Sequence, residues 1–271
     1  MPEALFNFVP IKKRIMKKLF FFILPLALTF CKNKEMSDTG TAPAADTTAM
    51  VVDSNNMLTD AEAASGWKLL FDGKSLDAWR VYNGDSIPHT WKVMDGQIVL
   101  KPEGPHGAMV GGDLVTRDTF GDFELKFDFK LADSANSGLF YLVNENPKLA
   151  IWQTAPEFQL VDNNYVNTHE MEAATNHLTA DNYDLMSCQG ATFNAAGQWN
   201  TAGVIKKGNR VEHWLNGVKC VEYEIGSKEY TALVAKSKFK PFKGWSLNKT
   251  GRIGLQNHGG EIAFRNIKVR G

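Results

Sequence analysis

The stretch DFELKFDFKL, residues 122–131, decides the fold. Large apolar side chains occupy every second position from Phe123 to Leu131, and charged side chains fill the positions between them. Because successive side chains of a strand point to opposite faces, this alternation predicts a long strand with one face on a core. A helix would instead need apolar residues at every third or fourth position.

Two further stretches have the pattern of tight β-hairpins. Residues 91–100 (WKVMDGQIVL) centre on Asp-Gly, and residues 210–224 (RVEHWLNGVKCVEYE) centre on Asn-Gly. These dipeptides favour two-residue turns because both central positions need positive φ. More strands are expected in SGLFYLV, PEFQLV and EIAFRNIKV. Many short strands separated by turns predict an all-β sandwich of two antiparallel sheets, forming one domain over residues 66–271.

The first 31 residues have the pattern of an export signal. Lys17 and Lys18 precede the apolar run LFFFILPLALTF, which ends at Cys31. Twelve residues are too few to span a bilayer, where about 20 are needed. A short basic region followed by an apolar stretch is typical of a secretory signal, and Met16 is a possible true start.

Cys31 follows this run in a way that resembles the lipobox of bacterial lipoproteins, although Phe30 stands where a small residue is usual. The resemblance implies acylation of Cys31 and anchoring to a bacterial membrane, facing the periplasm or the cell surface. The alternative is an ordinary signal peptide with a chance cysteine.

Residues 32–65 are poor in large apolar side chains, and such a segment cannot bury enough surface to become ordered. We therefore expect a flexible linker. Near its end, Thr59 and Glu62 have the spacing of a helix capping box, and a second short helix is expected over residues 227–237.

The composition argues against some partners. Acidic and basic residues are equal in number, and the sequence pI is near 7. A phosphate backbone needs a basic surface, so nucleic acid is not an expected partner, and no nucleotide cofactor is expected either. Cys188 and Cys220 could pair in an exported protein, or each could be a buried, unreactive thiol.

Polar side chains occupy the non-core face of two predicted strands. In PEFQLVD, Phe158 and Leu160 point to the core, so Glu157 and Gln159 point away from it. In GRIGLQNHGG, residues 251–260, Gln256 and His258 point away in the same manner. If these strands share a concave sheet, the four side chains converge, and the glycines that follow leave room for a ligand.

Nine stretches of the chain together resemble the family first labelled DUF1080. Its members are described as 3-keto-disaccharide hydrolases or as 3-keto-glucoside lyases and hydratases. The resemblance implies a concanavalin-A-like jelly-roll sandwich. The matching stretches, in order, are GWKLLFDGKSLDAWR, GGDLVT, FGDFELKFDFK, NSGLFYLV, PEFQLVD, GQWN, VEHWLNGVK, GRIGLQNHGG and FRNIKV.

The resemblance implies cleavage of glucosides that carry a ketone at C3. The ketone acidifies the C2 proton, so a base can remove it, the enolate can expel the group at C1, and water can then add. Such a site needs a base near C2 and, at the ketone oxygen, either a divalent metal ion or hydrogen-bond donors. The Glu157 strand lacks the second acid of a two-carboxylate glycosidase. The alternative is a non-catalytic, lectin-like carbohydrate-binding module on the same fold.

His258 and Glu157 are the candidate catalytic residues, and with Asp113 they are the candidate ligands of one divalent metal ion of unknown identity. Less specific explanations are a strand-end imidazole bonded to a carbonyl, a paired surface carboxylate, and a turn aspartate. The candidate substrate-binding residues are Gln159, Gln256, Asn136, Tyr183 and Arg265.

Other residues are weaker candidates. His106 could add a metal ligand, whereas His169 and His177 do not have the spacing of a known metal motif. Trp79 and Trp152 are expected to pack in the core rather than against a sugar. Asp128 and Lys130 belong either to the groove or to a solvated face. Two positions depart from the family's pattern, because Asn257 and Gly260 stand where acids are usual, and either change could impair activity.

Overall fold

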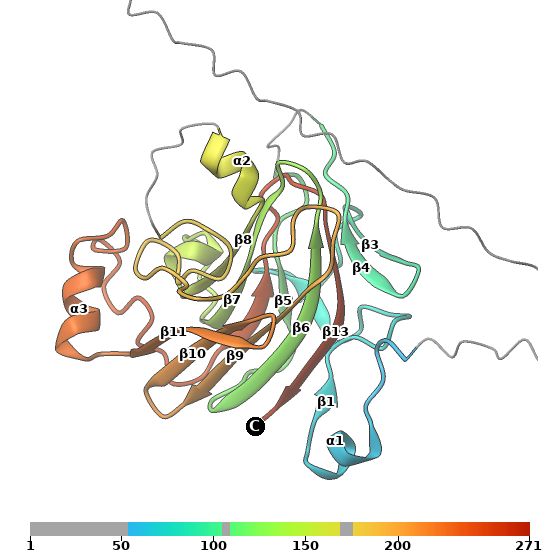
Figure 1. The fold of residues 1–271 in the computed structure, drawn as a ribbon, viewed down its shortest axis with the longest axis horizontal. Coiled ribbons are helices and arrows are strands. Elements are labelled where there is room, and N and C mark those ends of the chain that lie inside the picture. Colours follow the sequence, from blue (N-terminus) through green and yellow to red (C-terminus); the bar gives the residue numbers. More distant parts are fainter. Residues whose placement is uncertain (1–53, 105–108, 169–175) are drawn as a thin grey trace, which may run out of the picture. The chain divides into compact units, whose positions relative to one another are not determined.

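A computed structural model describes residues 54–104, 109–168 and 176–271, which belong to one compact unit (Figure 1). The strands of the first sheet are β1 (Lys68–Leu69), β3 (Trp91–Met94), β4 (Gln97–Leu100), β6 (Phe123–Leu131), β9 (Asn200–Lys207), β10 (Arg210–Leu215), β11 (Val218–Glu224) and β13 (Ile262–Arg270). Those of the second are β2 (Trp79–Val81), β5 (Leu114–Thr116), β7 (Asn136–Val143), β8 (Glu157–Val161) and β12 (Arg252–Leu255). The helices are α1 (Asp60–Ala64), η1 (Ile151–Gln153, 3-10), α2 (Asn163–Thr168) and α3 (Lys228–Val234).

The two sheets confirm the all-β sandwich. Among the described residues, the eight-stranded sheet has the order β11-β10-β9-β6-β13-β4-β3, with β1 also paired to β13. The five-stranded sheet has the order β2-β5-β12-β7-β8. All strand pairs are antiparallel, and sequence neighbours such as β12 and β13 lie in different sheets.

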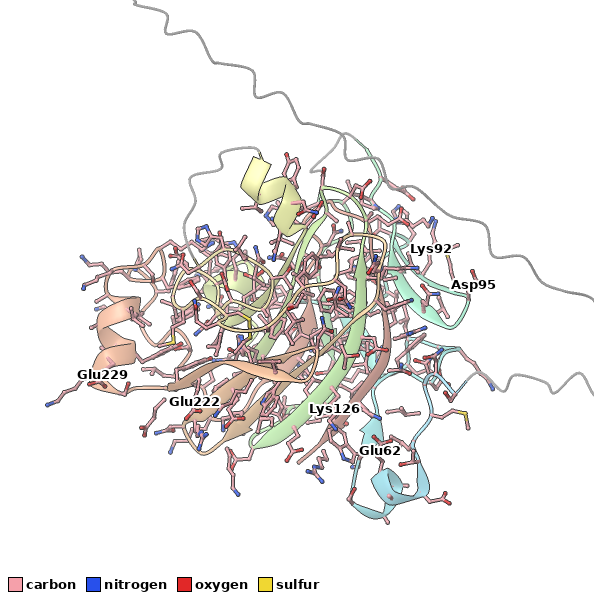
Figure 2. All side chains as sticks on the ribbon, viewed as in Figure 1. Glu62, Lys92, Asp95, Lys126, Glu222 and Glu229 are labelled. Carbon is pink, nitrogen blue, oxygen red and sulfur yellow. A yellow bond between two sulfur atoms is a disulfide. The ribbon has the colours of Figure 1, made fainter. Side chains whose placement is uncertain are left out.

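Strand β6 forms as its alternation predicts and lies between β9 and β13. Its apolar face is buried, and the Phe127 ring packs edge-on against Phe158 of the other sheet, with centroids 5.7 Å apart. The core therefore lies between the sheets. Lys126 and Glu222, labelled in Figure 2, are exposed on the polar outer face of the eight-stranded sheet.

Both predicted hairpins are present as β3–β4 and β10–β11. The central residues all have positive φ: 49° and 69° at Asp95 and Gly96, and 48° and 84° at Asn216 and Gly217. The predicted short helices are also present as α1 and α3, and α1 begins with the reciprocal Thr59–Glu62 capping box.

The folded unit begins before Gly66, which corrects the expected linker boundary. Asn56 is buried, its backbone N–H donates to Asn266 Oδ1 at 2.6 Å, and its side chain donates to the Gly96 carbonyl at 2.8 Å. These specific polar contacts order a segment that buries little apolar surface, which composition does not reveal. The export segment and Cys31 lie outside the described residues. Within the described residues, no helix is long and apolar enough to cross a membrane.

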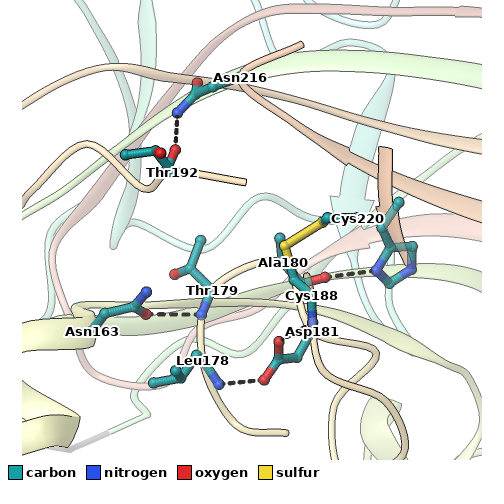
Figure 3. The surroundings of a disulfide bond; sticks show 10 residues. Asn163, Leu178, Thr179, Ala180, Asp181, Cys188, Thr192, Asn216 and Cys220 are labelled. Atoms are coloured by element: carbon teal, nitrogen blue, oxygen red, sulfur yellow. Dashed lines mark hydrogen bonds between the residues drawn. A yellow bond between two sulfur atoms is a disulfide. The ribbon is translucent and has the colours of Figure 1, made fainter. Parts of the chain in front are cut away.

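Cys188 and Cys220 are paired, which resolves the two alternatives left by the sequence. The disulfide joins the long segment after β8 to strand β11, beside Ala180 and Asp181 (Figure 3). Asp181 accepts hydrogen bonds from the backbone N–H groups of Cys188 and Leu178. The segment that crosses the edge of β8 is thus fixed both covalently and by hydrogen bonds.

Candidate active site

The outer face of the five-stranded sheet carries a row of polar and small residues at one end. Gly138 on β7 pairs with Gln159 on β8, and the N–H of Gln256, just after β12, donates to the Gly138 carbonyl at 2.9 Å. Leu255 pairs with Leu114, so Asp113 continues the row next to Gln256. The rest of this face is apolar, since it carries a second buried cluster comprising Val115, Phe140, Val143, Ile151 and Ala155.

A pocket of about 220 Å³ opens over this row. Its volume is below the range of about 300–1,000 Å³ that is usual for drug-sized ligands, which suits a ligand the size of one sugar ring. The lining residues are Met109, Gly112, Asp113, Asn136, Ala150, Ile151, Trp152, Glu157, Gln159, Tyr183, Lys238, Gln256, Asn257 and His258. Seven of the eight residues predicted to act at the site are among them.

Glu157 is the buried carboxyl group of the pocket, with only 4% of the residue exposed. Its side chain lies over Gly138, where an added Cβ would be 2.1 Å from Glu157 Oε1. The glycine therefore provides the space that the carboxyl group occupies. In the described part of the chain, no hydrogen bond or ion pair satisfies this carboxyl. Burial raises the pKa of Glu157 to about 8; nearby Lys238 opposes the shift, and Asp113 adds to it.

Asp113 supplies a second carboxyl group to the pocket. Its Oδ1 accepts the backbone N–H of Asn257 at 2.8 Å, and burial raises its pKa to about 6 against the effect of that hydrogen bond. Asp113 comes from the β5 side of the row, so the second acid that the Glu157 strand lacks is present on a neighbouring segment.

The two departures from the family's pattern have structural roles. The Asn257 side chain donates to the Val110 carbonyl at 2.7 Å and accepts the N–H of Gly259 at 3.1 Å. An ionised aspartate could not make the first of these bonds. At Gly260, an added Cβ would be 2.5 Å from the Asn136 backbone nitrogen, so no side chain fits without a backbone shift.

Two buried acceptors in the pocket wall have no donor within the described residues: Asn136 Oδ1 and Gln256 Oε1. A buried acceptor left without a partner costs about 1–3 kcal/mol, and a sugar hydroxyl group could satisfy it. Gln159 is different, since its Oε1 accepts the Leu160 N–H at 3.2 Å.

The segment that carries Tyr183 is held from two sides. Its backbone pairs with β8: the Ala180 N–H donates to the Gln159 carbonyl at 2.8 Å, and the Tyr183 N–H donates to the Glu157 carbonyl at 3.1 Å. From the opposite sheet, His213 Nδ1 donates to the Ala180 carbonyl at 2.9 Å, the bond drawn in Figure 3. His213 is fully buried, which lowers its pKa to about 4, and its Nε2 contacts the Tyr141 hydroxyl at 2.8 Å.

Sequence reasoning missed Lys238, which reaches the pocket from the segment after α3. Its Nζ lies 4.1 Å from the Tyr183 ring centroid and 4.7 Å from that of Trp152. Partial burial lowers the pKa of Lys238, while Glu157 and then Asp184 raise it. Trp152 packs on Phe242 as expected of an apolar residue, but it also lines the pocket. No periodic pattern in the sequence marks either residue.

Several weaker candidates lie elsewhere. Arg265 is on the eight-stranded sheet, where it pairs with Asp128 at 3.3 Å and lies 4.0 Å over the Trp199 ring, so it does not line the pocket with the other candidates. Lys130 also lies over Trp199, on that solvated outer face. Trp79 is buried in the core, as expected.

The predicted metal ligands share a pocket but do not form a metal-binding group. Across residues 54–104, 109–168 and 176–271, no three His, Cys, Asp or Glu side chains could together hold a metal ion. His258 is exposed at the mouth, whereas Glu157 is buried beneath it. His106 and His169 lie outside the described residues.

Comparison with known proteins places this chain in a family. Residues 66–270 match the model of the 3-keto-alpha-glucoside-1,2-lyase-like domain. A protein of Bacteroides thetaiotaomicron named 3-keto-disaccharide hydrolase is 33% identical over 244 residues, covering 82% of this chain and 83% of that protein. Two crystal structures from Parabacteroides distasonis, both provisionally described as glycosyl hydrolases, have TM-scores of 0.72 and 0.55 at 34% and 26% identity. They cover 80% and 75% of this chain and 98% of each solved chain. On this evidence the chain belongs to the 3-keto-alpha-glucoside-1,2-lyase-like domain family.

Proposed function

We propose that the protein is a carbohydrate-active enzyme that cleaves the glycosidic bond of 3-keto-glucosides or 3-keto-disaccharides. The reaction proceeds by removal of the C2 proton, elimination at C1 and addition of water. One observation carries the proposal: Glu157, a buried carboxyl group without a partner among the described residues, lies over the floor of a pocket sized for one sugar ring. The family match and the name of the Bacteroides relative support a ketone-bearing substrate.

Glu157 has the properties of the base in this reaction. A base acts best when its pKa is near the working pH, because it is then partly ionised and stronger than a solvated carboxylate. With a pKa of about 8, Glu157 meets both conditions. The side-chain amides of Asn136 and Gln256 and the charge of Lys238 then surround a bound sugar and its developing enolate.

His258 suits proton transfer to the leaving group. It lies at the exposed mouth, where the aglycone of a glucoside bound over Glu157 would leave. A sugar alkoxide is a poor leaving group, so a proton donor at that position lowers the barrier to breaking the C1–O bond.

A second candidate function rests on Asp113. Asp113 and Glu157 are two carboxyl groups with raised pKa values in one pocket. An ordinary glycosidase uses such a pair of carboxyl groups for catalysis. The two candidates differ in substrate, because an ordinary glycosidase cleaves an unoxidised glucoside and never exchanges the C2 proton.

The deciding experiment compares 3-keto-trehalose, 4-nitrophenyl 3-keto-glucoside and unoxidised 4-nitrophenyl glucoside. Aglycone release and C2 deuterium exchange are followed with and without a chelator. We expect release and exchange with the keto substrates alone, and loss of both in Glu157→Gln. His258→Ala should slow 3-keto-trehalose far more than the nitrophenyl substrate, because nitrophenolate leaves without a proton. Cleavage of the unoxidised glucoside would favour the second function. If the protein binds sugar but shows neither aglycone release nor C2 exchange, the lectin-like module is the better interpretation. Loss of activity with the chelator would support the expected divalent metal ion.

We also propose that the protein is exported and anchored to a membrane through acylated Cys31. The Cys188–Cys220 disulfide supports an oxidising compartment. Expression with Cys31→Ser should move the protein from the membrane fraction to the soluble fraction. An unchanged distribution would contradict the anchor.

A further inference from the structure

Lys238 supplies the primary amine among the described residues that line the pocket. Its Nζ lies over the faces of Tyr183 and Trp152, and no hydrogen bond or ion pair within the described residues engages it. Its backbone N–H donates to Asp184 Oδ2 at 2.9 Å, which fixes the residue beside the pocket.

We propose that Lys238 forms a covalent iminium with the C3 ketone of the substrate. This inference rests on the proposed function, and it adds a catalytic step to the same site. The amine nitrogen bonds to C3 and the ketone oxygen leaves as water. Glu157 then takes the C2 proton, which gives an enamine. The enamine electrons expel the C1 oxygen, which leaves as the protonated aglycone. Water adds across C1 and C2, and a second water hydrolyses the iminium, returning the free amine and the 3-keto sugar.

The surroundings of Lys238 suit this chemistry. An iminium is a cation, and aromatic faces within about 6 Å stabilise a cation. It withdraws electrons from C2 more strongly than a neutral ketone does, so a carboxylate is a sufficient base. Partial burial lowers the pKa of the amine, which raises the fraction of its nucleophilic form.

Lys238 and Glu157 face one pocket as separate groups. The two groups line one pocket and interact electrostatically. However, no ion pair within 4.0 Å joins them in the described residues, as salt bridges elsewhere in the chain do. A sugar ring between them would present C3 to the amine and C2 to the carboxylate.

Reductive trapping tests the proposal. The full-length protein is mixed with 3-keto-trehalose and cyanoborohydride, and its intact mass and proteolytic peptides are measured. We expect the mass to increase by one reduced sugar, with the adduct on the peptide that contains Lys238. Lys238→Arg keeps the charge but cannot form an iminium, so it should lose trapping and at least about 10²-fold in kcat. The matched control is Lys240→Arg, an exposed lysine two residues away, which should keep both.

The outcomes separate this inference from the proposed function. If the wild-type protein cleaves 3-keto-trehalose, forms no adduct, and Lys238→Arg retains its kcat, Lys238 acts only as a charge and the inference is overturned. An adduct distributed over Lys240 and other surface lysines would overturn it as well. If the wild-type protein does not cleave the keto substrate at all, the proposed function itself fails.

Discussion

Substitution of Gly138 by alanine tests whether the glycine determines the position of Glu157. The added Cβ would be 2.1 Å from Oε1, 2.8 Å from Cδ and 2.9 Å from Cγ of Glu157. Ordinary contact begins near 3.4 Å, so the carboxyl oxygen must move by about 1.3 Å. A displacement of about 1 Å in a catalytic group can cost about 10²-fold in rate. Overpacking of this kind destabilises a protein by about 1–3 kcal/mol.

The assay is a double-mutant cycle with Glu157→Ala, measured by urea unfolding, beside kcat on 3-keto-trehalose. All three close contacts are with atoms that Glu157→Ala removes. In that background Gly138→Ala should therefore be neutral or slightly stabilising, because alanine loses less backbone entropy than glycine on folding. An equal penalty in both backgrounds would refute the reasoning, and so would a Gly138→Ala enzyme with wild-type kcat.

Further predictions concern pH, a hydrogen bond and the disulfide. The kcat/KM for a 3-keto-glucoside should rise with pH through about 8, because the ionised form of Glu157 is the proposed base; a rise near 4.5 would contradict this role. His213 has a pKa of about 4 when folded and an ordinary value of 6.5, so its contribution to stability is complete above pH 6.5 and is lost as pH falls through 4. As pH falls from 6.5 to 4, the difference in unfolding free energy between the wild type and His213→Gln should shrink, by at most about 3 kcal/mol. A difference that stays constant over this pH range would contradict the lowered pKa of His213. Asn257→Asp should cost about 1–3 kcal/mol in urea unfolding, because the Val110 carbonyl loses its donor; unchanged stability would show that this bond contributes nothing. Reduction of Cys188–Cys220, separated by 32 residues, should lower stability by about 4 kcal/mol, and an unchanged unfolding midpoint in reductant would contradict the constraint.

Local patterns were enough to predict many of the strands and both hairpin turns, whereas β1, β2, β5 and β9 were not among the expected strands. The alternation in β6 and the Asn-Gly and Asp-Gly turns depend on side chains within a few residues of one another. The order of strands in each sheet could not be predicted in this way, because it depends on packing between distant segments. The early boundary of the folded unit was missed for the same reason, since Asn56 is ordered by Asn266, far along the chain.

The site was predictable where the alternation of side chains along a strand decides which face each side chain occupies. This alternation placed Glu157, Gln159 and Gln256 on one face, and the structure brings them together in one pocket. The alternation does not reveal which sheet a strand joins, so it could not show that Arg265 lies on the other sheet, where it pairs with Asp128. Lys238 reaches the pocket through the packing of an irregular segment, which no period in the sequence describes.

The attachment of the Tyr183 segment limits how a substrate can enter. One side of this segment is bonded to β8, and the Ala180 carbonyl is bonded to His213 in the interior of the sandwich. Moving the Tyr183 segment outward would expose the buried imidazole of His213 to solvent. The backbone amide hydrogens of this segment should therefore exchange as slowly as those of the core strands. Under the proposed function, the substrate would enter past the exposed side of the mouth, where His258 lies, with the oxidised ring of the sugar ahead of its leaving group.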